Sequence, residues 1–97
     1  GKILDVVVDL RRNSRTFGKY FSIRLSDQNS LSLFIPKGFA HGYLCLDNKN
    51  TILYLLNKKY SSKNNLGFFW KDKKFKIKWG IIKPILSSKD KNLREYK

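Results

Sequence analysis

Several residue types that build common functional sites are scarce in this chain of 97 residues. A single Cys excludes a disulfide framework and any metal site made of several thiolates. A single His, even together with that Cys, cannot complete the three- or four-ligand shell of a transition metal, so no metal is expected. No apolar run is long enough to span a membrane and no signal peptide is visible, so we expect a reduced, cytoplasmic setting.

Methionine is absent altogether, and the chain opens on Gly1, directly followed by a strand-like run. An intact bacterial or cytosolic product usually begins with Met. The sequence therefore predicts that the N-terminus is cut and that the chain is the second part of a longer one.

Acidic residues are also few, with 7 Asp and Glu against 21 Lys and Arg, and the formal net charge is +14. Such a charge favours a nucleic-acid partner. However, the lysines are spread through many loops and the C-terminal third, and no DNA- or RNA-binding motif accompanies them. The preferred interpretation is a solvated basic surface with no nucleic-acid partner.

The residues that are abundant favour β structure, because 41% of the chain is hydrophobic and 14% is aromatic. The length allows one small domain, residues 1–97. Alternation and turn residues predict strands over Lys2–Leu10, Lys19–Ser26, Leu31–Ile35, Phe39–Leu46 and Thr51–Leu56, an amphipathic strand or arm over Phe75–Trp79, and a helical turn from Ser87. Short strands separated by turns predict an all-β antiparallel sandwich or barrel.

The faces of the first two strands can be assigned from the alternation of their residues. The faces expected to point inward carry Leu4, Val6, Val8, Leu10, Phe21, Ile23 and Leu25, whereas Tyr20, Ser22 and Arg24 are expected to point outward. The other face of the first strand carries Asp5 and Asp9, which we expect to form one structural pair facing a barrel mouth or solvent, without a catalytic role.

The stretch Leu33–Leu46 organises the rest of the chain. Pro36-Lys37-Gly38 has the composition of a tight turn. The following strand places His41 on one face with Tyr43 and Cys45. A polar ring beside a turn, backed by an aromatic side chain, can present a group to a ligand in the mouth of a small β-barrel.

The pattern Pro36-x-Gly38-x-x-His41 resembles the second motif of the cupins, which are jelly rolls. Three longer runs, Asp5–Arg11 (DVVVDLR), Ile35–Gly42 (IPKGFAHG) and Leu86–Asp90 (LSSKD), are similar to the dTDP-4-dehydrorhamnose 3,5-epimerase family. The similarity extends over essentially the whole chain and corresponds to roughly the C-terminal half of that enzyme. It implies a cupin-type jelly roll (double-stranded β-helix), present here as a single partial domain and an incomplete barrel that lacks its N-terminal strands.

The resemblance also implies a reaction. The family epimerises C3 and C5 of dTDP-4-keto-6-deoxyglucose in dTDP-L-rhamnose biosynthesis, without a metal or nucleotide cofactor, and its full-length members are homodimers. A base removes a proton beside the ketone and an acid returns one to the opposite face. Carried over by motif, the catalytic residues are the acid Tyr54 and Asp90, which orients the base, and the substrate contacts are His41, Tyr60, Asn65 and Lys89, with Tyr60 stacking on the thymine.

The base itself is a His in the N-terminal half of the family. That half is absent from this sequence, and His41 belongs to a different, substrate-binding motif. The chain alone is therefore predicted to be inactive.

Simpler interpretations stand beside these roles. His41 could be a hydrogen-bonded structural residue, Tyr54 a half-buried core residue, and Asp90 the cap of a helical turn. Trp70 and Trp79 are expected to serve packing or a dimer interface, and Cys45 to be a small buried apolar residue.

The sequence also leaves three alternative interpretations of the chain. The chain could belong to another cupin sugar-nucleotide enzyme, such as a 3-epimerase or a ketoisomerase. It could be a basic nucleic-acid-binding module. It could also be a degenerate fragment that no longer folds, whose open sheet edges pair with another chain.

Overall fold

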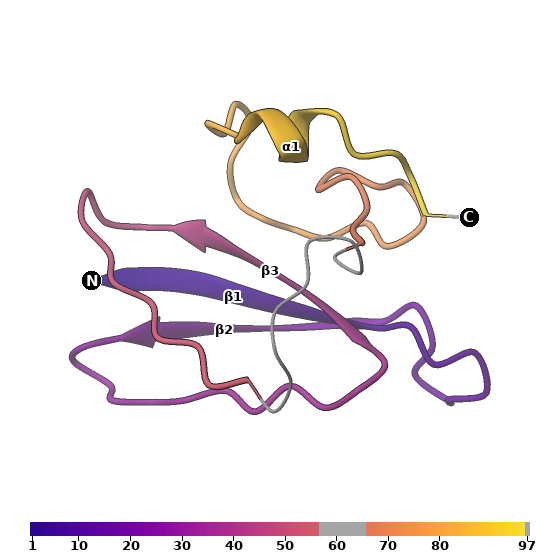
Figure 1. Ribbon diagram of the computed structural model, residues 1–97, viewed down its shortest axis with the longest axis horizontal. Coiled ribbons are helices and arrows are strands. Elements are labelled where there is room, and N and C mark those ends of the chain that lie inside the picture. Colours follow the sequence, from indigo (N-terminus) through magenta and orange to yellow (C-terminus); the bar gives the residue numbers. More distant parts are fainter. Residues whose placement is uncertain (57–65, 97) are drawn as a thin grey trace.

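The computed structural model describes residues 1–56 and 66–96 and contains one small antiparallel sheet. Its strands are β1 (Lys2–Asp9), β2 (Tyr20–Ser26) and β3 (Phe39–Cys45), in the spatial order β2-β1-β3 (Figure 1). The only helix among the described residues is α1 (Ser88–Lys91), a single turn. The described part of the chain is thus all-β apart from this turn, which confirms the predicted class and the helical turn after Ser87.

The central strand β1 carries buried residues on both of its faces. Val6 and Val8, exposed by only 1% and 2%, form the core that the sequence predicts. On the other face, Ile3, Asp5 and Asp9 are buried as well. Asp5 contacts His41 and Asp9 contacts Arg11, so the two carboxylates neither pair with each other nor face solvent, and that part of the expectation is wrong.

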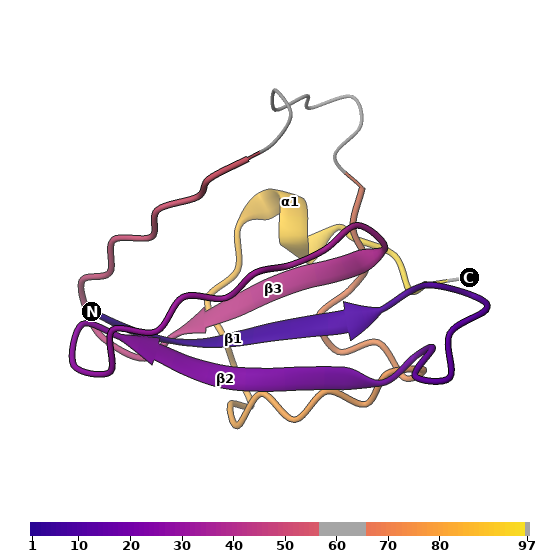
Figure 2. The ribbon, with the colours of Figure 1, turned by 90° about the horizontal axis from the view of Figure 1, so that it is seen from below.

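Residues 66–96 cover one face of the sheet, as the two views of the ribbon agree (Figures 1 and 2). Phe75 inserts against Val6 and Val8, and its ring centroid lies 4.7 Å from that of Phe68. Trp79 packs against the same core, and its indole Nε1 donates a hydrogen bond of 2.9 Å to the carbonyl of Trp70. These aromatic contacts fix the C-terminal layer on the sheet, so Trp79 serves packing.

Two of the predicted strands do not form among the described residues, and 75–79, predicted as a strand or an arm, does not form a strand either. The stretches 31–35 and 51–56 have no strand partner there, because hydrophobic alternation favours an extended backbone but only a hydrogen-bonded neighbour makes a strand. The predicted strand at 75–79 is interrupted by Lys76, which adopts a positive φ of 52°. That turn starts at Asp72, whose carbonyl accepts the Lys76 amide.

Two burial predictions also fail. Tyr20 packs against the core although it was expected to point outward, and Phe21 is 53% exposed although it was expected to point inward. The reason is the side on which the C-terminal layer lies: Tyr20 is paired with Val8, on the covered face. Cys45 is exposed rather than buried, because it ends β3 on the opposite face. Within the described residues, no helix has the length and apolar character needed to cross a membrane.

Candidate functional site

A carboxylate and an imidazole meet on the face of the sheet opposite to the C-terminal layer. The register sets Asp5 of β1 opposite Tyr43 and sets Val7 opposite His41 of β3, so all four side chains share one face. The Nε2 atom of His41 lies in hydrogen-bond contact with Oδ1 of Asp5. Asp5 is only 4% exposed, and the His41 side chain is 22% exposed. The carboxylate therefore holds the imidazole in one orientation at the surface of the sheet.

Tyr54 lies against this pair although it is outside the sheet. Its ring centroid lies 6.1 Å from that of His41, in an edge-on arrangement. The Tyr43 ring lies 6.2 Å from the same imidazole, on the neighbouring position of the β3 face. Tyr54 is half exposed, so its phenol lies at the rim of the cluster and remains accessible. We refer to Asp5, His41, Tyr43 and Tyr54 as the His41 cluster.

The cluster favours the protonated form of Tyr54. Partial burial raises the pKa of the phenol above its ordinary value of 10.0, because ionisation would place a charge in a poorly solvated position. The charges that Tyr43 and Asp5 carry when ionised, and a hydrogen bond between the two phenols, raise the pKa further. Tyr54 therefore carries its proton at neutral pH and can donate it to a strongly basic carbanion or enolate.

A second buried carboxylate anchors the loop that joins β1 to β2. Asp9 accepts hydrogen bonds from Arg11 Nε at 3.0 Å and from Ser14 Oγ at 2.6 Å, and also from the Thr16 hydroxyl. The guanidinium of Arg11 stacks 4.8 Å from the centroid of Phe39. The hydrogen bonds from Arg11 hold the pKa of Asp9 far below its usual range, against the opposing effect of burial.

Arg11 also packs beneath the turn that leads into β3. Gly38 adopts a φ of 94°, and a Cβ atom built there would lie 2.6 Å from Cγ of Arg11. Only glycine combines this backbone conformation with so close an approach. The Asp9–Arg11 network thereby fixes where β3 begins, and with it the position of His41.

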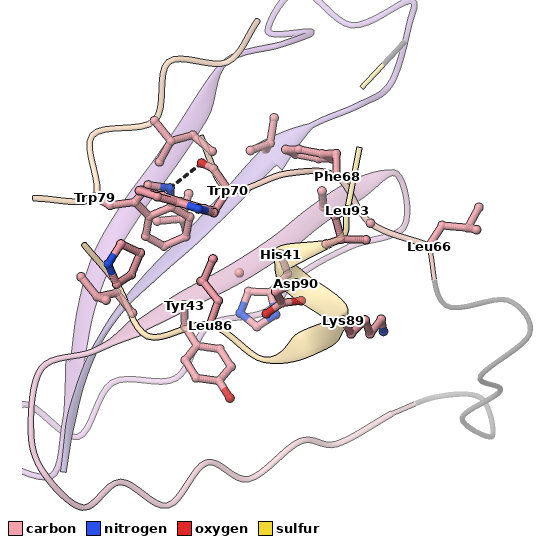
Figure 3. Close-up of a pocket in the computed structure, with 18 of the residues that line it drawn as sticks. His41, Tyr43, Leu66, Phe68, Trp70, Trp79, Leu86, Lys89, Asp90 and Leu93 are labelled. Atoms are coloured by element: carbon pink, nitrogen blue, oxygen red, sulfur yellow. Dashed lines mark hydrogen bonds between the residues drawn. The ribbon is translucent and has the colours of Figure 1, made fainter. Parts of the chain in front are cut away.

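A groove of about 480 Å³ runs between β3 and the C-terminal layer (Figure 3). Most of its walls are apolar, and they include Leu44, Leu66, Phe68, Trp70, Trp79, Leu86 and Leu93. Lys89 and Asp90 of α1 line it together with His41 and Tyr43 of β3. The structure thus brings one cation and one carboxylate of the last helical turn to the edge of the sheet that carries His41.

The helical turn is capped by a residue other than Asp90. Ser87 is the N-cap, and its Oγ accepts a hydrogen bond of 3.1 Å from the Asp90 backbone amide. The interpretation of Asp90 as the cap is therefore wrong. Its side chain is exposed and makes no hydrogen bond or ion pair within residues 1–56 and 66–96.

The outcome for the predicted site residues is mixed. His41 and Tyr54 are in contact, and Lys89 and Asp90 share the groove with His41. Tyr60 and Asn65 lie outside the described residues. In the described ranges no group of three or more His, Cys, Asp or Glu side chains could hold a metal ion.

Sequence reasoning placed Tyr43 on the face of His41 but missed Asp5 as a member of the cluster. The sequence did offer a clue for Asp5, because it lies among β-branched residues in the middle of a predicted strand. A carboxylate buried there is costly unless a partner group binds it. The identity of that partner depends on the register between β1 and β3, which the sequence does not contain.

Comparisons with known proteins match the whole chain. The family model described as dTDP-4-dehydrorhamnose 3,5-epimerase matches residues 1–97. The enzyme of that name from Shigella flexneri is 41% identical over 96 residues, which are 99% of this chain and 53% of that protein. The one from Methanothermobacter thermautotrophicus is also 41% identical and covers 95% of this chain and 51% of its own length.

Solved structures agree with the sequence matches. An epimerase from Mycobacterium tuberculosis superimposes with a TM-score of 0.94 at 32% identity, over 98% of this chain and 49% of that one. The enzyme from Bacillus anthracis, solved with TDP and PPi bound, gives a TM-score of 0.82 at 36% identity, over 99% of this chain and 55% of that one. The chain thus spans about half the length of the relatives it matches. On the family match and these relatives, it belongs to the dTDP-4-dehydrorhamnose 3,5-epimerase family.

Proposed function

We propose that the chain is the C-terminal half of a dTDP-4-dehydrorhamnose 3,5-epimerase, with the fold of a cupin-type jelly roll that lacks its N-terminal strands. It forms a single partial domain over residues 1–97. The support is the coverage of about half of each relative, together with a sheet of only three strands among the described residues.

The proposed reaction inverts C3 and C5 of dTDP-4-keto-6-deoxyglucose. The C4 ketone acidifies the neighbouring C–H bonds, so removal of a proton leaves an enolate with its negative charge on oxygen. Return of a proton to the opposite face of the ring inverts the carbon. The protonated phenol of Tyr54 is the proton donor, and the observation that carries this role is its contact with the His41–Asp5 pair.

The remaining roles follow from the groove. Asp90, whose carboxylate has no partner among the described residues, lies at the groove and orients the imidazole base that the other half of the family supplies. Lys89 lies one residue away and offers a cation for the diphosphate. A relative from Legionella pneumophila, 28% identical, was solved in complex with dTDP-4-keto-L-rhamnose, which supports a substrate of this class. Tyr60 and Asn65 complete the proposed substrate contacts, with Tyr60 against the thymine.

The complete enzyme is proposed to be a cytoplasmic homodimer without a nucleic-acid partner. No cofactor takes part, since the carbonyl of the substrate itself acidifies the reacting carbons.

Binding of the substrate to the 97-residue chain tests this proposal, read by NMR as shifts of His41, Tyr54 and Lys89. We expect dTDP-4-keto-6-deoxyglucose at millimolar concentration to change the chemical shifts of these residues. In the Tyr54→Phe variant, the substrate should still change the chemical shift of Lys89. Binding of DNA that weakens steeply with salt, with no response to the sugar nucleotide, would instead favour a basic nucleic-acid-binding module.

Turnover is a separate measurement. In D₂O the chain alone should leave C3 and C5 of the substrate unlabelled, because the base is missing. Deuterium incorporation by the isolated chain would show that these residues include a base. That result would contradict the proposal that the base comes from the other half of the family.

A further inference from the structure

The side chain of Tyr54 is restrained by few contacts. Its segment, 51–56, forms no strand and makes no main-chain hydrogen bond with another described residue. The residues on either side of it, Leu53 and Leu55, are 84% and 90% exposed. Tyr54 itself is only half exposed, because its ring packs back onto β3. The position of its phenol therefore depends on the side chains that it meets there.

Two side chains of β3 meet Tyr54. The imidazole of His41 lies edge-on to the Tyr54 ring, and the Tyr43 ring lies against the same imidazole at an interplanar angle of 37°. The hydroxyl of Tyr43 also shares a hydrogen bond with that of Tyr54. His41 thus contacts Tyr54 through its ring, whereas Tyr43 reaches the atom that carries the proton.

Tyr43, unlike Tyr54, is placed by the sheet. It lies inside β3 and directly opposite Asp5 of β1, in an antiparallel ladder that fixes its main chain. Because alternate side chains of a strand share a face, Tyr43 and His41 are held on the same side of the sheet. Asp5 is buried there and contacts His41. An anchored phenol therefore lies beside one whose main chain is outside the sheet.

We infer that Tyr43 is a positioning residue, which holds the phenol of Tyr54 beside His41 with its proton in place. This role rests on the proposed function, because it serves the reaction only if Tyr54 is the proton donor. Return of a proton to carbon requires the donor to stay within reach of that carbon in one orientation. A donor on an extended segment outside the sheet meets this requirement only when another side chain restrains it. Tyr43 supplies the restraint and acts through Tyr54 rather than on the substrate.

The hydroxyl of Tyr43, more than its ring, is the group that this role needs. Burial, the charges that Tyr43 and Asp5 carry when ionised, and the hydrogen bond between the phenols all raise the pKa of Tyr54. The substitution Tyr43→Phe retains a ring against His41 but removes the hydrogen bond. It therefore separates the contribution of the hydroxyl from that of packing.

Side-chain NMR of the 97-residue chain is the first test. In the unmodified chain we expect one χ1 rotamer for Tyr54 and nuclear Overhauser contacts from its ring to His41 and to Tyr43. In Tyr43→Phe the ring should sample the three staggered χ1 wells, so the Overhauser contact to His41 should weaken by about threefold. The imidazole ¹⁵N shifts should stay unchanged, because Asp5 still holds His41.

The matched control is Tyr96→Phe. Tyr96 packs on the core side of the sheet, against Phe68 and Phe75, so it lies on the face opposite to the His41 cluster. Its substitution also removes one phenol hydroxyl and should leave the rotamer and the Overhauser contacts of Tyr54 unchanged.

Substrate separates a positioning role from a merely structural one. With dTDP-4-keto-6-deoxyglucose at millimolar concentration, Tyr43→Phe should retain the chemical-shift response of Lys89 but reduce that of the Tyr54 ¹³Cζ atom by about threefold. A merely structural role would reduce both responses together. If Lys89 does not respond in either chain, the proposed function fails, and the comparison of the free chains still tests the role of Tyr43.

Two results would overturn the inference. One is a Tyr54 side chain that keeps its single rotamer and its contact to His41 in Tyr43→Phe. The other is the absence of an Overhauser contact between Tyr43 and Tyr54 in the unmodified chain, a measurement that decides the question even if Tyr43→Phe does not fold.

Discussion

The imidazole Nε2 of His41 lies against Oδ1 of Asp5, although the two residues are 36 positions apart in the chain. The two meet because β1 and β3 are antiparallel neighbours. The register sets Asp5 directly opposite Tyr43, and His41 is the next residue of β3 on the same face. Burial of Asp5 makes this contact energetically significant, since a buried carboxylate without a partner is costly. The pair joins the central strand β1 to its neighbour β3.

Removal of the Asp5 charge should loosen His41. We expect Asp5→Asn to lower the free energy of unfolding by about 1–3 kcal/mol, the cost of weakening a buried hydrogen bond to a charged group. Urea denaturation gives the free energy, and ¹⁵N shifts of the imidazole report its altered hydrogen bonding. Asp47→Asn is the control, because Asp47 is exposed and should give a change near zero. Equal effects of the two substitutions would show that the contact contributes nothing.

The raised pKa of Tyr54 predicts a loss of stability in alkali. Because the phenol ionises less readily in the folded state, its contribution is fully present below pH 10.0 and is lost as the pH rises through the folded pKa. The tyrosine ¹³Cζ shift should show Tyr54 titrating above 10.0 in the native chain. Tyr43→Phe should bring its pKa back toward 10.0, since the neighbouring charge and hydrogen bond are removed. A Tyr54 pKa that Tyr43→Phe does not change would contradict the contact between the two phenols.

The lowered pKa of Asp9 predicts that the chain loses stability in acid. Its pKa is depressed in the folded state, so the stability it contributes is present above the ordinary value of 3.8 and is lost as the pH falls below that value. Asp9→Asn should flatten the dependence of the unfolding free energy on pH between about 5 and 2. Glu95→Gln changes an exposed carboxyl and should leave that dependence intact. An unchanged acid limb in Asp9→Asn would exclude this role.

Substitutions of two glycines with similar φ angles distinguish the cost of backbone strain from the cost of a steric clash. Gly38 and Gly18 have φ values of 94° and 79°, but only at Gly38 would a Cβ atom meet Arg11, whereas nothing lies within 4 Å of one at Gly18. Gly18→Ala should cost roughly 1–2 kcal/mol from the left-handed conformation alone. Gly38→Ala should cost about 1–3 kcal/mol more, because Arg11 must shift away from Asp9. Thermal denaturation of both variants gives the difference, and equal losses would show that Arg11 adapts freely.

The extended segments of the chain were largely predictable from local pattern. The three strands that form were each expected to within one residue at either end, because alternation and turn residues such as Pro36 and Gly38 are local properties. Strand pairing is not local, so the sequence could not distinguish the paired strands from 31–35 and 51–56. The positive φ of Lys76 likewise follows from the turn at Asp72 rather than from the alternation of its neighbours.

The site divides in the same way. The sequence by itself determined which chemical groups are available: one imidazole, a few phenols, and an Asp preceded by Lys in the last helical turn. Only the tertiary structure decided which of them meet, because register and the side on which residues 66–96 pack are set by contacts between distant residues. That packing covered part of Tyr20 and left Phe21 exposed, and the register brought His41 to Asp5, which no spacing along the chain expresses.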